Sequence, residues 1–150
     1  MLKRPARHLR LRHFAQRIGR RGEQAAAEYL ANAGYDLLCR NYRAPHGVGE
    51  LDLILRDPAG VICIVEVKTR REKHAQQLRP AWAVDESKQQ KIRRAAKAYA
   101  QALPNCEATL RFDVVEVWCS KNGIPKRLRH WPGAFGWKRR NPAKIPEEIT

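Results

Sequence analysis

The stretch Gly49–Arg70, GELDLILRDPAGVICIVEVKTR, decides the fold of this chain. It consists of two runs rich in Val, Ile and Leu, separated by the tetrapeptide DPAG, and this pattern predicts two antiparallel strands joined by a tight turn. Asp52, Glu66 and Lys68 interrupt the apolar runs. Charged side chains are seldom buried without a partner, so strands that look buried need a reason to carry them.

The turn Asp57–Gly60 predicts the register between the two strands. Asp in the first position, Pro in the second and Gly in the fourth are type I turn preferences, and Gly60 in the left-handed conformation would form a G1 bulge. In that register Asp52 lies opposite Glu66, and Lys68 shares their face. A loop of two or four residues without a compensating bulge would turn Asp52 to the other face.

Two carboxylates that face each other across strands repel unless something neutralises them. A hard divalent cation, Mg²⁺ or Mn²⁺, is the expected partner because it prefers carboxylate oxygens, and Lys68 could then position a water and stabilise developing phosphate charge. The pattern also fits a purely structural alternative. Glu66 could emerge into solvent and pair with Lys68 or Arg70, while Asp52 could bond to turn backbone.

A third acid, Glu23, lies in a helix predicted from about residue 20 to 33. It shares the helical face of Ala26, Ala27 and Leu30, so its side chain could reach toward the sheet. It is a candidate third carboxylate of a metal site. The alternative is an ordinary acid favoured by the helix dipole near an N-terminus.

The remaining pattern predicts an α/β domain with the element order α-β-β-β-α-β. A helix–strand pair at the end implies a crossover between parallel strands, and hence a small mixed sheet flanked by helices. After the first helix, the expected elements are strands over 35–43, 50–56 and 61–68, a polar irregular loop over 69–84, a helix over 85–103 and a strand over 110–118.

The net charge of +15 is concentrated at the two ends of the chain. Residues 1–22 carry eight Lys or Arg and no acid, and residues 121–150 carry eight basic and two acidic residues, whereas residues 23–120 are nearly balanced. We therefore expect a basic N-terminal arm over 1–18, a central domain over 19–120 and a basic C-terminal tail over 121–150. Such ends favour nucleic acid through phosphate contacts; the alternative is solvated tails that only aid solubility.

The four cysteines lack metal-site spacing, and free thiols suit a reducing compartment. The N-terminus lacks the apolar segment of a secretory signal, and no apolar run is long enough to span a membrane. The sequence therefore predicts a cytoplasmic protein that does not enter the membrane.

The motifs GRRGEQAAAEYLANAGY, NYR, GELDLIL, VEVKTR, KQQKIRRAAKAY and RFDVVEV together resemble the YraN-like uncharacterised protein family. The resemblance covers about residues 19–118. That family is classed with restriction-endonuclease-like, PD-(D/E)XK folds and is similar to archaeal Holliday-junction resolvases. The combination of GELDLIL with VEVKTR is specific, whereas either half alone would be weak.

The resemblance implies roles for five residues. Asp52, Glu66 and Lys68 fill the acid, acid-x-lysine signature, Glu23 takes the place of the supporting helix glutamate, and the backbone carbonyl of Val67 would help hold the metal. A metal-dependent endonuclease on structured or branched DNA is the implied activity, and the resemblance allows a homodimer. The alternative is a non-catalytic protein that keeps this fold and binds DNA or RNA.

Basic residues near the predicted site are candidates for phosphate contact. Arg70, Arg71 and Lys73 follow directly on the strand of Glu66, while Lys88 and Lys91 lie on the second helix, where an ordinary solvated face is the alternative.

Five further residues of the chain are expected to have structural roles. Asp113 is expected to pair with Arg111, Glu50 is expected opposite Lys68, and the tail aromatics are expected to dock the C-terminal segment on the core: Trp131, Phe135 and Trp137.

Overall fold

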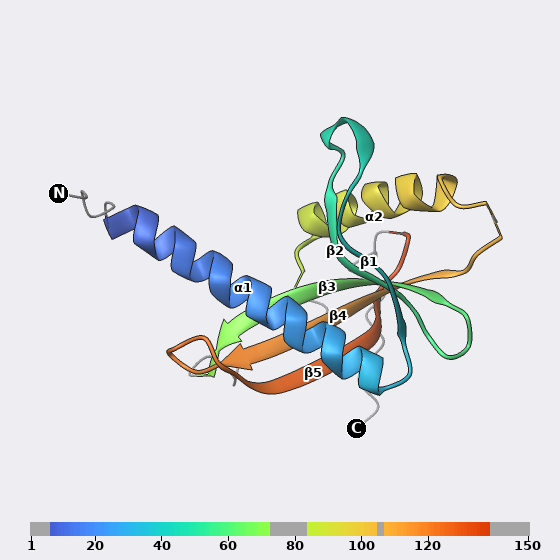
Figure 1. Ribbon diagram of the computed structural model, residues 1–150. Coiled ribbons are helices and arrows are strands. Elements are labelled where there is room, and N and C mark those ends of the chain that lie inside the picture. Colours follow the sequence, from blue (N-terminus) through green and yellow to red (C-terminus); the bar gives the residue numbers. More distant parts are fainter. Residues whose placement is uncertain (1–6, 73–83, 105–106, 139–150) are drawn as a thin grey trace, which may run out of the picture.

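The structure, a computed structural model, describes residues 7–72, 84–104 and 107–138. It is an α/β domain, as predicted, with five strands and two long helices (Figure 1). The elements in chain order are α1 (Arg7–Asn32), β1 (Asp36–Arg43), η1 (Pro45–Gly47), β2 (Glu50–Arg56), β3 (Ile62–Arg71), α2 (Glu86–Gln101), β4 (Leu110–Cys119) and β5 (Pro125–Phe135).

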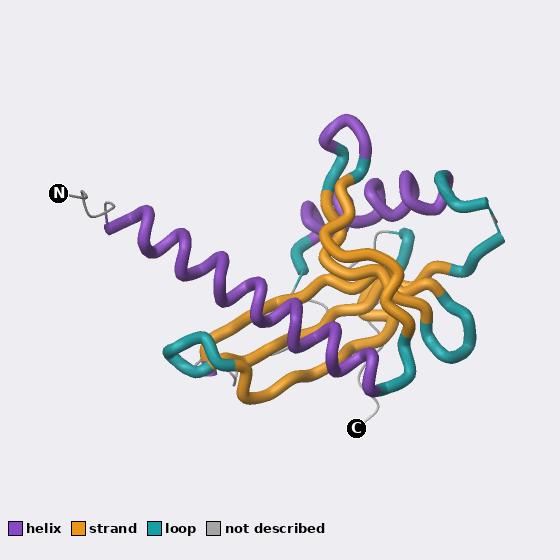
Figure 2. The backbone as a smooth tube through the Cα atoms, viewed as in Figure 1, coloured by secondary structure: helices purple, strands orange, loops and turns teal. Residues whose placement is uncertain are grey.

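The sheet is mixed, and its strands lie side by side in chain order from β1 to β5. β3 and β4 are parallel, and α2 lies in the connection between them, as the predicted crossover requires. The other neighbouring strands are antiparallel. The far end of β1 and β2, with η1 between them, projects away from the sheet beside α2 (Figure 2).

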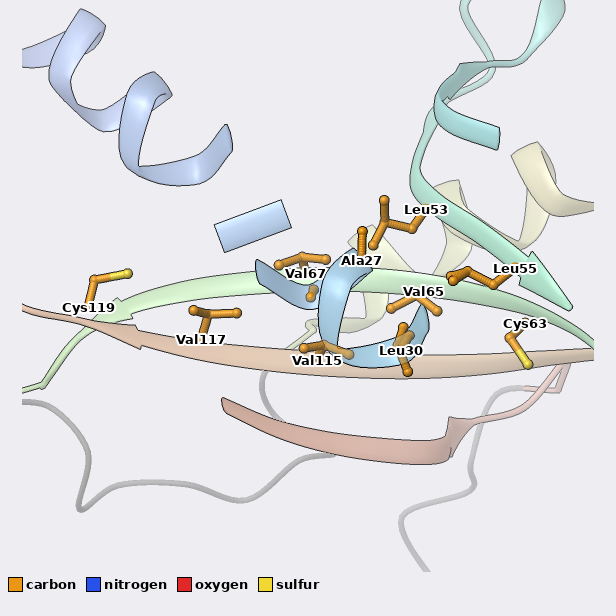
Figure 3. Close-up of a cluster of buried hydrophobic side chains, with 11 residues drawn as sticks. Ala27, Leu30, Leu53, Leu55, Cys63, Val65, Val67, Val115, Val117 and Cys119 are labelled. Atoms are coloured by element: carbon orange, nitrogen blue, oxygen red, sulfur yellow. The ribbon is translucent and has the colours of Figure 1, made fainter. Parts of the chain in front are cut away.

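Each face of the sheet packs against one helix because side chains alternate along the strands. Toward α1, Val65 and Val67 of β3 meet Ala27 and Leu30 in one buried cluster (Figure 3). Toward α2, Ile64 and its neighbours join a second cluster with the apolar face of that helix, which contains Ile92, Ala95 and Ala96. β3 is therefore buried on both faces, which explains its nearly continuous apolar run.

The turn between β2 and β3 has the predicted geometry. Gly60 donates its N–H to the carbonyl of Asp57 at 2.9 Å and has a φ of 88°, as a G1 bulge requires. The Asp57 carboxylate also accepts the N–H groups of Ala59 and Val61, both at 2.9 Å. The register that follows pairs Leu53 with Val65 and continues in step to the turn, as predicted.

Helix α1 begins at Arg7 and not near residue 20, so the predicted start of this helix is wrong. Leu11, Phe14 and Ile18 follow one another at helical spacing, and they line the same groove as Val67 and Thr69 of the sheet. Residues 7–18 are therefore helical, and within them Arg10, Arg12 and Arg17 lie on the helix with exposed side chains. Within the described residues, no helix combines the length and the apolarity needed to cross a membrane.

Strand β5 was not predicted, and it adds an edge strand to the expected core. The pairing shifts register between Phe112 and Val114 of β4, opposite the segment that holds Pro132 and Gly133. A bulge on an edge strand tolerates both residue types. The aromatic residues dock as expected, since Phe135 stacks on Phe112 with ring centroids 5.0 Å apart.

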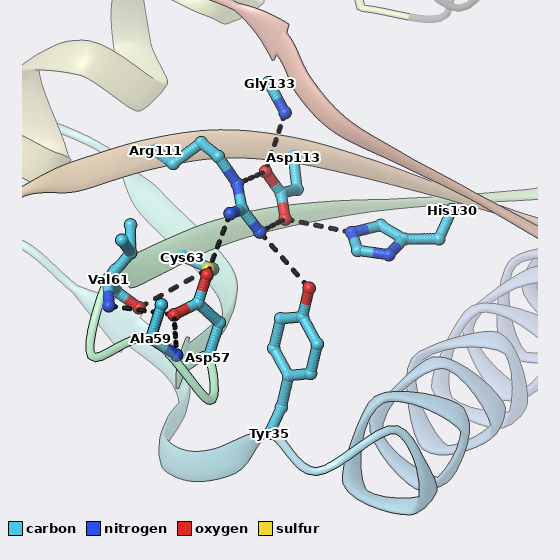
Figure 4. Close-up of polar contacts among 9 residues, drawn as sticks. All are labelled: Tyr35, Asp57, Ala59, Val61, Cys63, Arg111, Asp113, His130 and Gly133. Carbon is cyan, nitrogen blue, oxygen red and sulfur yellow. Dashed lines mark hydrogen bonds and ion pairs between the residues drawn. The ribbon is translucent and has the colours of Figure 1, made fainter.

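Asp113 is the centre of a polar network that joins the turn, β4 and β5 (Figure 4). Its carboxylate is fully buried and accepts hydrogen bonds from Arg111 at 2.8 Å and from the N–H of Gly133 at 2.9 Å, and it lies 2.9 Å from His130 Nε2. Burial alone would raise the pKa of Asp113, but these hydrogen bonds hold it below its ordinary value. Arg111 also reaches Asp57 at 2.9 Å, so the expected Arg111–Asp113 pair is confirmed within a larger network.

Gly22 of α1, next to Glu23, lies directly against Thr69 of β3. A side chain at Gly22 would overlap Thr69 Oγ1 and would come within 3.1 Å of Thr69 Cβ. Glycine is normally unfavourable inside a helix by about 1 kcal/mol, so its place here reflects the close contact with the strand. Gly22 thereby fixes how near α1, and with it Glu23, lies to the sheet.

We predict that Gly22→Ala lowers the free energy of unfolding by about 1–3 kcal/mol, because the added methyl overpacks this contact. The matched control is Gly19→Ala, where a Cβ would meet nothing within 4 Å. It should stabilise the helix by about 0.5–1 kcal/mol. Chemical denaturation measures both values, and Thr69→Ala should restore most of the loss in the Gly22 variant. A Gly22→Ala protein as stable as the Gly19→Ala protein would contradict the packing argument.

Candidate active site

Strand β2 separates from β3 beyond Leu53, and Asp52 stands at the point of separation. The backbone pairing between the two strands covers Leu53 to Arg56. At the next position the Asp52 side chain replaces the backbone of β2 as the hydrogen-bond partner of β3. Its Oδ2 accepts a hydrogen bond from the backbone N–H of Val67 at 2.9 Å. The N–H that the diverging strand leaves unpaired is thereby satisfied, and the carboxylate is fixed against β3.

Glu66 lies beside Asp52 and is almost fully buried, with 5% of its surface exposed. Its Oε1 is 3.4 Å from Lys68 Nζ of the same strand and 3.6 Å from Lys88 Nζ of α2. Its Oε2 is buried and has no hydrogen-bond partner among the described residues. Buried polar atoms are normally paired, so an unpaired carboxylate oxygen beside two lysines calls for an explanation.

The two carboxylates influence each other strongly. Burial raises the pKa of Glu66 to about 7, and the charge of Asp52 and a hydrogen bond shared with it add to this rise, while Lys88 and Lys68 oppose it. A pair of this kind is stabilised either by a shared proton or by a cation. The donor set fits a hard divalent cation, since both groups offer carboxylate oxygens and one oxygen is unpaired.

Glu23 of α1 faces the same end of the sheet. It lines the groove beside Val67 and Thr69 and also a second hollow beside Asn41 and Glu50. Burial raises the pKa of Glu23, and the charge of Asp52 raises it further. The charge of Asp52 is therefore felt at Glu23, and the role of Glu23 as a supporting acid stays a prediction.

The acids do not form a three-carboxylate cage. In the part of the chain that the structure describes, no group of three or more His, Cys, Asp or Glu side chains is arranged to hold a metal ion. The candidate ligands that lie together are Asp52 and Glu66, with Glu23 further off. A metal at this site would need water and the predicted carbonyl of Val67, or a movement of Glu23, to complete its coordination.

Arg70 and Arg71, predicted together as phosphate contacts, lie on opposite faces of β3. Both residues line the groove beside α1, but Arg71 is exposed, whereas the Arg70 guanidinium pairs with the buried Glu116 at 3.4 Å. Lys91 is exposed on α2, and Lys73 lies outside the described residues.

Glu50 does not face Lys68, and that prediction is wrong. Because β2 leaves β3 at Asp52, Glu50 pairs across β1 instead, and its carboxylate lies 3.1 Å from Arg43 Nε.

Two features of the site were not predicted. Lys88 is expected from the sequence to contact phosphate, but in the structure α2 places it against Glu66. This proximity depends on how α2 packs between β3 and β4. Glu116 is a fully buried acid in the apolar run of β4, and it lies next to Lys68 in the parallel register. Its position in RFDVVEV, a lone acid among apolar residues, was the available signal for it.

Comparison with known proteins confirms the resemblance found in the motifs. The model of uncharacterised protein family UPF0102 matches residues 22–117. A UPF0102 protein of Desulfosudis oleivorans is 42% identical over 109 residues, which are 73% of this chain and 85% of the relative. A UPF0102 protein of Symbiobacterium thermophilum is 45% identical over 116 residues, which are 77% and 92% of the two chains. The matched residues include Glu23, Asp52, Glu66, Lys68 and Lys88.

We predict that Glu66 makes the cation-free protein less stable as the pH rises. The folded state holds the proton of Glu66 up to a pKa of about 7, whereas the unfolded chain releases it near the ordinary value of 4.5. The stability therefore falls between these pH values, by on the order of 3 kcal/mol, and the loss is complete above pH 7. Glu66→Gln should remove this part of the decline. Denaturation in EDTA across the pH range measures it.

The control for this measurement is Glu28→Gln, which changes an exposed glutamate of α1. Its stability should follow the wild-type pH profile. A Glu66→Gln profile parallel to that of the wild type would show that Glu66 titrates normally in the folded protein.

Proposed function

Because this chain belongs to the uncharacterised protein family UPF0102, whose name assigns no activity, we propose a function from the site itself: a metal-dependent nuclease that hydrolyses phosphodiester bonds. One observation carries the proposal. A buried glutamate with an unpaired oxygen lies beside a fixed aspartate and two lysines, at a point where the sheet opens. A hydrogen-bonded pair of uncharged side chains, or a single acid on the surface, would not require lysines to be placed beside it.

Each residue has a definite task in the proposed reaction. Asp52 and Glu66 would hold the cation, with the Val67 carbonyl and Glu23 as supporting ligands. When bound, Mg²⁺ or Mn²⁺ would supply positive charge for the phosphate and would lower the pKa of water. Lys68 would orient the attacking water and stabilise the negative charge that develops on the phosphate oxygens. Lys88, whose Nζ lies 3.6 Å from the same Glu66 oxygen that Lys68 approaches, provides a second positive charge from α2.

The proposed substrate is DNA, in a structured or branched form. Similarity to junction resolvases suggests branched DNA, and the basic residues of α1 supply charge for the phosphates beside the site. Arg12, Arg17 and Arg20 are exposed on this rigid helix. These cations on α1 can contact the phosphates of the DNA backbone beside Asp52 and Glu66 while the reacting phosphate enters the site.

A second candidate is a nucleic-acid-binding protein without catalysis. The observation that favours it is the pairing of Glu66 with both Lys68 and Lys88, since two lysines can neutralise the acids without any cation. The described residues also lack a third carboxylate in the group. Under this alternative the acids and lysines stabilise the end of the sheet, and binding requires no metal.

We predict that the wild-type protein cleaves a labelled four-way junction, flap, single strand or RNA in Mg²⁺ or Mn²⁺ and not in EDTA. Asp52→Asn and Lys68→Ala should each lower the cleavage rate by about 10²-fold or more, because each removes a group that acts on the reacting phosphate. Gel electrophoresis of the labelled products measures the rates. Glu50→Gln is the matched control, since Glu50 pairs with Arg43 and should leave the rate unchanged.

Two results would count against the nuclease. Binding of these substrates without cleavage of any of them would leave the non-catalytic alternative. Cleavage that persists undiminished in both site variants would place the activity elsewhere or in a contaminant.

A further inference from the structure

A strip of arginines crosses the α2-side face of the sheet, beyond the acids. Arg70 lies on β3, and Arg127 and Arg129 lie on β5, with Glu116 and Trp118 of β4 between them. The registers join these residues, because Trp118 pairs with Arg70 on one side and with Arg127 on the other, while Arg129 pairs with Glu116. We call Arg70, Arg127 and Arg129 the arginine strip.

Two of these arginines are held in place by tryptophans. The guanidinium of Arg127 lies 4.6 Å from the ring centre of Trp118, and that of Arg129 lies 4.0 Å from the ring centre of Trp131. Both distances fall within the range of a cation–π interaction. Both arginines are exposed, so stacking orients them on the surface without neutralising their charge.

Unsatisfied polar atoms lie at Arg70 of the strip and at positions of β3 and β4 beside it. Four buried side-chain atoms of the described residues have no hydrogen-bond partner: Glu66 Oε2, Arg70 Nε, Glu116 Oε1 and Trp118 Nε1. All four belong to adjacent positions of β3 and β4, on the face that carries the acids. Such atoms are rare in folded proteins, and each one calls for an explanation, of which a functional role is one. The Arg70–Glu116 pair, at 3.4 Å, is therefore only partly satisfied.

We propose that the arginine strip binds the sugar–phosphate backbone of a DNA duplex and guides it to the acids. This inference rests on the proposed nuclease function, and it names the form of DNA that the same site takes. Lys68 and Arg70 lie two residues apart on one face of β3, about 6.6–6.8 Å along the strand. A backbone that runs over the strip therefore reaches Lys68 and Glu66 within one or two phosphates.

The surroundings of the strip favour a duplex over a single strand. Proteins that hold single strands stack the bases on open aromatic rings. Here Trp118 is almost fully buried, and both tryptophan rings already carry an arginine. The groups offered to the ligand are guanidinium edges, which pair with phosphate oxygens. Glu116 accepts a hydrogen bond from the Trp131 Nε1–H at 3.1 Å and so fixes the ring on which Arg129 stacks.

We predict that the double variant Arg127→Gln with Arg129→Gln binds a fluorescein-labelled DNA duplex about tenfold more weakly, because it loses two phosphate contacts. The slope of log affinity against log salt should decrease by about 2. Fluorescence anisotropy of the full chain in EDTA measures both, without cleavage. Arg56→Gln with Arg94→Gln removes the same charge from exposed positions elsewhere and is the control, with less than half of either effect.

A second variant separates charge from folding. Arg127→Lys with Arg129→Lys keeps both charges and should retain most of the salt slope, and thermal unfolding should show that all variants are folded. A strip variant that binds the duplex like the control, or that loses affinity only for the single strand of the same sequence, would overturn the proposal. So would a wild-type protein that does not bind the duplex.

The binding and cleavage experiments fail independently of each other. Weak duplex binding by the strip variant, together with no cleavage by the wild type, would retain the strip and reject the nuclease. Cleavage by the wild type, with duplex binding by the strip variant equal to that of the control, would retain the nuclease and reject the strip.

Discussion

The hydrogen bond from the Val67 N–H to the Asp52 carboxylate, at 2.9 Å, is the interaction on which the site depends. Where β2 separates from β3, the N–H of Val67 loses its backbone partner. The Asp52 side chain replaces that partner. The same bond fixes the carboxylate next to Glu66. The two acids are thus brought together by the way in which the sheet ends, and their shared charge follows from that geometry.

The charges around this point form a connected arrangement over three layers. Glu23 approaches from α1 because Gly22 lets that helix lie close to Thr69. Lys88 approaches from α2 on the other side and meets Glu66. Across the sheet, the arginine strip continues the positive surface from Lys68 toward β5. Cations therefore surround the buried Glu66 and the half-buried Asp52. Under the proposed function, these cations would allow a polyanion to approach the two carboxylates.

Local chemistry decided which features could be predicted from the sequence. The DPAG turn gave the register of β2 and β3, and alternation then placed Asp52 and Glu66 together, because both depend on neighbouring residues only. The predicted α1 was too short. Its first part is rich in basic residues, which is typical of an unstructured arm, whereas the helical spacing of Leu11, Phe14 and Ile18 indicates the helix. Strand β5 contains Pro132 and Gly133, which argue against a strand unless a bulge is known. Lys88 reaches Glu66 only through the crossover, which local patterns do not determine.

Anomalous diffraction from crystals of the full chain grown with Mn²⁺ would show whether Asp52 and Glu66 together hold a divalent cation. If they do, an anomalous peak lies within about 2.0–2.3 Å of an oxygen from each carboxylate, and the Lys68 and Lys88 amines have moved away from Glu66. The peak should also disappear in Asp52→Asn. A Mn²⁺ ion bound elsewhere, with Glu66 still paired to both lysines, would contradict the proposed cation site.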